Sequence, residues 1–352
     1  MAIETDRCRF LAGVRLGRTL GTPICIVVEN KDYGNWAGVM SPERPAEQPV
    51  SVGDRLTVPR PGHADLSGLA KYGHDDVRNV LERASARETV GRVAGGAVCK
   101  RLLSEMGVSV RGRVISIGTA GVEAGGDFAH PDNIDWAAVD ASSVGCDDPQ
   151  VAAAMRAEVD RAREAGESLG GVFEIWCWGL CPGLGGYGRP QDRLDGLLLG
   201  ALGSIPAIKG AEIGEGFLNA GRVGSLVHDP IALREDDRGA WIARETNRAA
   251  GIEGGMTTGM PVVIRAAMKP IPTLTTPLPS VDVSTLQGTM AHVERSDVAA
   301  VAAARVVGEA MAALTLAEAY LEKFGGDSLA QLRASVLAYE GAVEERGLWR
   351  RS

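Results

Sequence analysis

Residues 79–92, NVLERASARETVGR, decide how the rest of the sequence is interpreted. The stretch is rich in residues that favour helix, and we expect it to lie within a long helix over residues 75–106. Residues four apart are neighbours on a helix, so Glu88 can pair with Arg92. Arg83 and Arg87 have no acidic helical neighbour, and like charges at this spacing repel each other. The pair therefore indicates an anionic partner.

The residues beside these arginines are small, which lets a ligand approach the helix closely. Ser85 stands between the two arginines and carries a hydroxyl group. A hydroxyl and two guanidinium groups suit a phosphate, because arginine presents a fork of N–H donors that matches phosphate oxygens. Ion pairs with carboxylates distant in the sequence are the alternative, and the residues alone leave both readings open.

Composition narrows the possible functions of the 352-residue chain. The net charge of −8 and the sequence pI of about 5.3 argue against broad nucleic-acid binding, which needs a basic surface. The 46 glycines are nearly double the usual share and predict many tight turns. An anionic ligand therefore requires that basic residues gather in one pocket.

Cysteine usage and hydropathy indicate where the protein works. The six cysteines lack the paired spacing of a zinc site, so we expect free thiols in a reducing compartment and no metal. The first ten residues, MAIETDRCRF, lack the apolar core of a signal peptide. No apolar run has the roughly 18 residues that a membrane-spanning helix needs. We therefore expect a cytoplasmic protein without membrane contacts.

Periodicity places strands and helices along the whole chain. Short apolar or alternating runs predict strands, and amphipathic or alanine-rich runs predict helices. Each half of the chain combines strands with one long alanine-rich helix, and no low-complexity linker divides it. We expect a single α/β domain over residues 1–352 with an internal duplication. The strands are expected at residues 22–30, 108–120, 170–180 and 260–269, the first of them buried. The further helices are expected at 148–166, 191–204, 297–324 and 328–347.

The run GLGGYG at residues 183–188 fits the G-x-G-x-x-G pattern of dinucleotide-binding loops and follows an expected strand. Arg189, Pro190 and Asp192 interrupt the helix that should begin there. The acidic residue expected at the end of a second strand is also not evident. We favour a glycine-rich turn and keep a nicotinamide-dependent oxidoreductase as a rival hypothesis.

Two further side chains are candidates for proton transfer. His63 lies in the turn RPGHADL at residues 60–66, close in sequence to the arginine helix, and histidine titrates near neutral pH. Asp297 follows Arg295 and Ser296 in ERSDV, where it can act as a base beside an anion site. The alternatives are a polar loop histidine, and a serine that caps the helix after residue 296.

Taken together, seven segments resemble the chorismate synthase family in their order and spacing. The longest is KYGHDDVRNVLERASARETVGRVAGGAV, and the resemblance runs from about Ile3 to about Glu345. The other six are RPGHADL, AIKGAEIGEGF, TNRAAGIEGGMTTGMP, AAMKPI, ERSDV and LEKFGGDSL. The resemblance implies the family's β-α-β sandwich fold and its homotetramer.

The resemblance also implies a reaction. The family converts 5-enolpyruvylshikimate 3-phosphate into chorismate by anti-1,4-elimination of phosphate and a ring hydrogen. Reduced FMN is needed although the net reaction is not a redox change, which makes the enzyme a carbon–oxygen lyase of the shikimate pathway. Both ligands carry phosphate, which accounts for the arginine pair. Reduction of flavin by the protein itself with NADPH, or by an external flavin reductase, both stay open.

Residue roles carry over by motif. His63 is expected to be the acid near the departing phosphate or the flavin, and Asp297 to help flavin N5 accept the ring proton. Ser85 and Arg87 are expected to face the substrate phosphate. The residues expected against FMN are Arg83, Ala84, Ser85, Pro206, Ala207, Gly254, Lys269, Pro270, Ile271, Pro272, Thr273 and Arg295.

The chain departs from the family pattern at its start. The usual GESHG strand and the RR…GYGRGGRM segment are absent, and Met1 corresponds to the last Met of the second segment. Pro206 replaces a more usual Gln or Asn, and Ala299 replaces a common Cys. A start codon assigned too late is the favoured explanation. The alternative is a truncated, inactive paralogue that binds FMN or phosphate ligands without turnover.

Overall fold

The computed structural model describes residues 7–31, 33–43, 55–122, 127–293 and 297–351. The chain forms two compact units, which we describe separately. The first unit comprises residues 1–94 and 277–292, and the second comprises residues 95–276 and 293–352.

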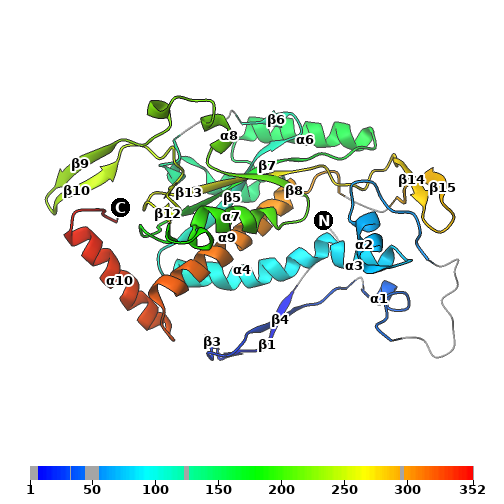
Figure 1. Ribbon diagram of the computed structural model, residues 1–352, viewed down its shortest axis with the longest axis horizontal. Coiled ribbons are helices and arrows are strands. Elements are labelled where there is room, and N and C mark those ends of the chain that lie inside the picture. The colour runs from blue at the N-terminus through cyan, green and yellow to red at the C-terminus, as the bar shows by residue number, and fades with distance from the viewer. Residues whose placement is uncertain (1–6, 32, 44–54, 123–126, 294–296, 352) are drawn as a thin grey trace. The chain divides into compact units, whose positions relative to one another are not determined.

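A five-stranded sheet is the centre of the second unit (Figure 1). Its strand order is β6-β5-β7-β13-β8, and every neighbouring pair is antiparallel. The predicted strands at 108–120, 170–180 and 260–269 are thereby confirmed. The bounds are β5 (Ser109–Ile117), β6 (Ala120–Gly121), β7 (Gly171–Trp178), β8 (Ile208–Ile213) and β13 (Val262–Met268).

Helices α9 (Val301–Phe324) and α7 (Leu194–Gly203) pack on one face of this sheet (Figure 1). α9 crosses β5 and β7 closely because its buried positions are mostly alanine and glycine. At Gly308, an added Cβ atom would lie 2.6 Å from the Phe173 ring of β7. The small residues of the sequence therefore serve a close helix–sheet contact.

Two more helices complete this unit, and both were predicted. α6 (Pro149–Glu164) lies against β5 and β6 at the edge of the sheet. It begins at Asp148, whose side chain accepts hydrogen bonds from the backbone N–H groups of residues 150 and 151. α10 (Leu329–Glu345) packs against α9, with the Phe324 and Tyr339 rings 5.5 Å apart.

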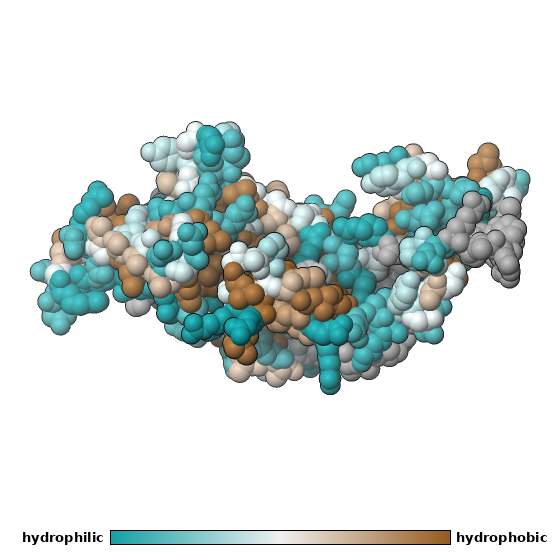
Figure 2. Space-filling model, turned by 90° about the horizontal axis from the view of Figure 1, so that it is seen from below, coloured by the Kyte–Doolittle hydropathy of each residue, from teal (hydrophilic) through white to brown (hydrophobic). Residues whose placement is uncertain are grey.

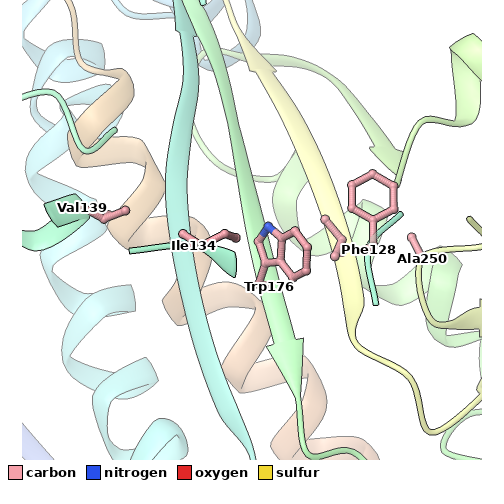
Figure 3. Close-up of a cluster of buried hydrophobic side chains, with 6 residues drawn as sticks. Phe128, Ile134, Val139, Trp176 and Ala250 are labelled. Atoms are coloured by element: carbon pink, nitrogen blue, oxygen red, sulfur yellow. The ribbon is translucent and has the colours of Figure 1, made fainter. Parts of the chain in front are cut away.

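The other face of the sheet carries an aromatic cluster and a row of charges. Side chains alternate between the faces of a strand, so Phe173 faces α9 while Glu174 and Trp176 face the opposite side. Figure 3 shows Trp176 between Ile134 and Phe128, with Ala250 beyond. The Phe128 and Trp176 rings pack edge to face at 5.7 Å.

The first unit is built from short elements. Strands β1 (Cys8–Ala12) and β4 (Cys25–Val28) form an antiparallel pair, as do β14 (Pro279–Asp282) and β15 (Gln287–Met290). Helices α2 (Asp65–Tyr72) and α3 (Arg78–Ala84) meet over a small core of Leu69, Val77 and Val80. Gly68 permits this contact, because an added Cβ would lie 2.5 Å from Val80.

Several short elements complete the described chain. They are β2 (Val14–Arg15), β3 (Arg18–Thr19), α1 (Tyr33–Trp36), α5 (Trp136–Ala141), α8 (Gly216–Asn219), β9 (Ile231–Asp236), β10 (Gly239–Arg244), β11 (Ile252–Glu253) and β12 (Met256–Thr257). Outside the five-stranded sheet, the sheets of the described residues have two strands each.

The structure corrects two expectations. The long helix over 75–106 is interrupted: α3 ends at Ala84, Ser85 is extended with ψ 141°, and α4 runs over Thr89–Ser104 after a 3-10 turn. The strand expected over 22–30 forms as β4, but none of its residues is buried. Its apolar side chains lie in a two-stranded hairpin, which has too few strands to bury them.

Hydrophobic side chains also reach the surface. Figure 2 shows hydrophobic atoms among hydrophilic ones on the face it presents, including the end where β9 and β10 lie. Ile231 and Leu233 of β9 are 67% and 73% exposed. Within the described residues, no helix has both the length and the apolar character needed to cross a membrane.

Candidate active site

His63 belongs to a buried cluster with Arg60 and Asp65 in the first unit. Asp65 is the first residue of α2 and has no exposed surface. Its Oδ2 atom accepts hydrogen bonds from the backbone N–H and the Nε–H of Arg60, both at 3.0 Å. Its Oδ1 atom contacts Nδ1 of His63. The imidazole is thus held by a carboxylate that is itself fixed at its other oxygen.

The Asp65 carboxylate is ionised at neutral pH. Burial on its own raises the pKa of Asp65, but hydrogen bonds from His63 and Arg60 outweigh burial and lower this pKa to about 2. A deprotonated carboxylate only accepts hydrogen bonds, so Nδ1 of His63 must be the donor. Neither Arg60 nor Asp65 was predicted as a site residue, although both stand within the same RPGHADL segment as His63.

The break at Ser85 determines where the arginines lie. The Ser85 hydroxyl accepts a hydrogen bond from the backbone N–H of Arg87 at 3.2 Å. Nη2 of Arg87 donates to the carbonyl oxygen of Glu29, also at 3.2 Å. Both contacts are within the first unit. Arg87 and Ser85 are therefore adjacent, as their expected shared role requires.

Arg83 is not isolated from carboxylates, contrary to the expectation from helical spacing. Its Nη1 atom lies 3.5 Å from Glu88, because the turn after Ser85 brings Glu88 back toward α3. The expected pair of Glu88 with Arg92 also forms, at 3.0 Å. The Arg83 side chain is 75% exposed, and such exposed pairs contribute only about 0–1 kcal/mol. Arg83 therefore keeps its capacity to meet an anion.

In the second unit, the structure brings residues 206–207 next to residues 269–273. The backbone N–H of Lys269 donates to the carbonyl oxygen of Ala207 at 3.0 Å, at the paired ends of β8 and β13. Ala207 has φ 67°, a conformation unusual for a residue with a side chain. The Ser168 hydroxyl donates to the Ile271 carbonyl at 2.6 Å, and Thr273 is buried. These contacts fix the two segments together.

Gly254 lies before β13, at the opposite end of this strand from Lys269. It belongs to the loop before β13, whereas Lys269 follows that strand. Gly255 accepts a hydrogen bond from Leu194 at the start of α7, and Pro206 comes after the end of this ten-residue helix. A helix of ten residues is about 15 Å long. Gly254 is near the start of α7 and Pro206 follows its end, so the two residues are not neighbours within one chain.

The segment around Asp297 differs from the capping alternative. α9 begins at Val301 with Ala300 in the N-cap position, so Asp297 precedes the helix. The chain is anchored just after it, because the Val298 carbonyl accepts a hydrogen bond from Leu169 at 2.8 Å. Arg295 and Ser296 lie outside the described residues.

The GLGGYG run is a turn. Gly185 has φ 83°, and an added Cβ would lie 2.4 Å from the Gly255 carbonyl oxygen. α7 begins at Leu194, six residues after the run ends. The neighbouring strands are antiparallel, so the parallel β-α-β unit of a dinucleotide fold is not formed in this sheet.

The described residues also contain a cavity that is separate from the expected site residues. A cavity of about 290 Å³ in the second unit is lined in part by Arg156, Arg163 and Ala299, and none of the expected site residues lines it. Across the described ranges, no group of three or more His, Cys, Asp or Glu residues is arranged to hold a metal ion.

Comparison with known proteins identifies the family. A model described as "Chorismate synthase" matches residues 1–321. The chain is 54% identical over 333 residues to a chorismate synthase of Desulforudis audaxviator, covering 94% of this chain and 83% of that protein. For one of Rubrobacter xylanophilus the identity is 50% over 346 residues, covering 98% and 85%. A solved structure described as "Crystal Structure of Chorismate Synthase" superposes with a TM-score of 0.78 at 39% identity, covering 97% of this chain and 85% of that one. The chain therefore belongs to the chorismate synthase family.

Proposed function

We propose that this protein converts 5-enolpyruvylshikimate 3-phosphate into chorismate and phosphate, as a carbon–oxygen lyase of the shikimate pathway. The identity of 54% to a chorismate synthase over nearly the whole chain carries the proposal. The buried Arg60–Asp65–His63 cluster supports it, because a loop histidine without a role has no need of a fixed, ionised partner.

The donor groups in the chain fit reduced FMN, whose phosphate is anionic. Lys269 offers an ammonium group and Thr273 a hydroxyl, and the segment that carries them is hydrogen-bonded to Ala207 and Ser168. By resemblance to the family, residues 83–85, 206–207 and 269–273 would hold the cofactor. When bound, reduced FMN supplies an electron to the substrate and recovers it.

The protein's own residues manage charge and protons. Elimination breaks a C–O bond to phosphate and a C–H bond on the opposite face of the ring, and it releases phosphate and a proton. Arg87 and Ser85 bind the phosphate and stabilise the negative charge that grows on it as the bond breaks. His63 is the proton donor near the phosphate or the flavin, and Asp297 assists removal of the ring hydrogen.

Assembly and the supply of reduced flavin belong to the same proposal. The family resemblance favours a homotetramer, and reduced FMN comes either from reduction by the protein with NADPH or from a separate flavin reductase. Oxidation of NADPH by the purified protein with added FMN separates the two sources.

An anaerobic assay with photoreduced FMN and 5-enolpyruvylshikimate 3-phosphate tests the function. We expect chorismate, measured by its absorbance, and phosphate in equal amounts. Binding of FMN without product would instead favour an inactive paralogue. Tight binding of a nicotinamide cofactor that persists without Arg83 and Arg87 but is lost in Gly185→Ala would favour an oxidoreductase.

A further inference from the structure

The two oxygens of Asp65 differ in their partners, and this difference sets the state of His63. Arg60 reaches both oxygens, but its bond from Nη2 to Oδ1 is the longest, at 3.4 Å. Oδ2 accepts two N–H groups of Arg60, one from the backbone and one from the side chain. Oδ1 faces Nδ1 of His63. Arg60 is 7% exposed and Asp65 is fully buried, so water does not compete for these bonds.

We infer that Asp65 is a positioning residue that holds neutral His63 as the Nδ1–H tautomer and leaves Nε2 as the nitrogen that exchanges protons with the ligand. Protonated His63 gives its Nε2 proton to a ligand oxygen and becomes the neutral Nδ1–H imidazole. The reverse transfer returns a proton to the Nε2 lone pair. The tautomer assignment stands on the contacts alone, whereas the proton exchange rests on the proposed function.

The contacts of Arg60 determine which way the side chain of an Asp65→Asn variant is oriented. In Asp65→Asn, the side chain has one carbonyl oxygen and one NH₂ group. Two donors of Arg60 lie 3.0 Å from the Oδ2 position, against one at 3.4 Å from the Oδ1 position, so the carbonyl oxygen is expected at the Oδ2 position. The NH₂ group then points at Nδ1 of His63, and Nδ1 has to become an acceptor. The substitution therefore switches His63 to the Nε2–H tautomer.

Arg60 also contacts the His63 ring, and as a donor it would favour an acceptor nitrogen, so the ionised Asp65 carboxylate is what makes Nδ1 the donor. Nη2 of Arg60 lies 3.1 Å from Nδ1 and 3.3 Å from Nε2, so it does not distinguish the two nitrogens strongly. The His63 side chain is 15% exposed, which leaves part of the ring accessible to a ligand. Because Asp65 occupies the Nδ1 side, proton exchange is left to Nε2, whose lone pair in this tautomer also faces the Arg60 guanidinium.

Nitrogen-15 NMR of the full chain, labelled at histidine, tests the inference. The five histidines are few enough to resolve, and the His63 signals are those lost in His63→Gln. Above neutral pH, we expect couplings of the Nδ1–H tautomer in the native protein and of the Nε2–H tautomer in Asp65→Asn. Asp75→Asn, which removes an exposed acid of the same unit, should leave the His63 signals unchanged.

A native protein with the Nε2–H tautomer would overturn the assignment, and this measurement needs no variant to fold. So would an Asp65→Asn protein that folds and keeps Nδ1–H. If the native protein shows the expected tautomer but forms no chorismate, the proposed function fails while the assignment stands.

Kinetics tests whether the tautomer matters for turnover. We expect kcat of Asp65→Asn to fall by about 10²–10⁴-fold with little change in KM, as for loss of an acid–base group. The His63→Gln, Asp65→Asn double variant should have the same kcat as His63→Gln, because Asp65 acts through His63. An unchanged kcat in Asp65→Asn with a switched tautomer would exclude Nε2 as the working nitrogen.

Discussion

Glu174 of β7 and Arg265 of β13 are directly opposite each other in the sheet and form a buried ion pair at 3.1 Å. On its other side, Glu174 is opposite Arg113 of β5 and contacts it at 2.7 Å. One fully buried carboxylate thus joins three neighbouring strands. Although burial opposes ionisation, the two arginines lower the pKa of Glu174, and the group stays charged.

Replacing this carboxylate should strongly destabilise the fold. Glu174→Ala removes the carboxylate that Arg113 and Arg265 share, although Arg113 keeps Asp147 and Arg265 keeps Glu215. Removing one member of a buried pair costs about 3–5 kcal/mol. Urea unfolding at neutral pH measures the loss. Glu318→Ala, at an exposed position of α9, should change stability by less than about 0.5 kcal/mol. Equal effects of the two substitutions would contradict a central role for Glu174.

Asp65 should make stability depend on acid pH. Its pKa is about 2 in the folded protein against an ordinary 3.8, so the folded state favours the ionised form. This contribution is complete above about pH 4 and is lost as pH falls through 2, and it amounts to about 2 kcal/mol. The stability difference between the native protein and Asp65→Asn should therefore shrink on acidification. A stability difference that stays constant from neutral to strongly acid pH would contradict a contribution from the ionised Asp65 carboxylate.

Two helix glycines should respond oppositely to alanine. At Gly308 of α9 a methyl group meets the fully buried Phe173 and Ile175, and overpacking costs about 1–3 kcal/mol. At Gly200 of α7 an added Cβ has no neighbour within 4 Å, so alanine should stabilise by about 0.5–1 kcal/mol. Thermal unfolding of both variants checks the signs. Stabilisation by Gly308→Ala would mean that the helix–sheet contact is looser than described.

Arg87 should contribute to substrate binding more than to stability. Loss of a charged hydrogen bond to phosphate costs about 1.5–3 kcal/mol, so Arg87→Met should raise KM for the substrate by about 10- to 150-fold. Arg161→Met removes an exposed arginine of α6 and should leave KM unchanged. If Arg87→Met lowers the unfolding temperature and not affinity, its contact with Glu29 is its main role.

The sequence predicted those helices and strands whose local residue pattern matches their burial in the structure. The strands around 110, 174 and 265 and the helix after Asp148 were placed correctly because alternation, capping and burial coincide there. The strand around 26 was predicted as buried because its apolar run looks the same whether a second layer covers it or not. Burial of a strand depends on what packs on it, and that information is distant in sequence.

The candidate site was predicted in part. His63, Ser85 and Arg87 were chosen from residue type and resemblance, and their roles stay predictions. Asp65 was missed because an acidic residue at the first position of a helix is common and needs no partner to explain it. The proximity of Lys269 to Ala207 depends on the antiparallel register of β8 and β13, which no local pattern gives. Arg83 was predicted to have no acidic neighbour because the prediction took the helix to continue through Ser85.

That interruption at Ser85 has an electrostatic consequence for the residues that follow it. Because the chain is extended at Ser85 and helical from Ala86 onward, Arg87 lies in the first turn of a new helix. The amino end of a helix carries about half a positive charge, which disfavours a cation there. In an unbroken helix, the N–H groups at this position would be paired within the helix and would not form a helix end. The interruption instead adds their field to the guanidinium charge, and a dianion bound beside Arg87 would relieve both.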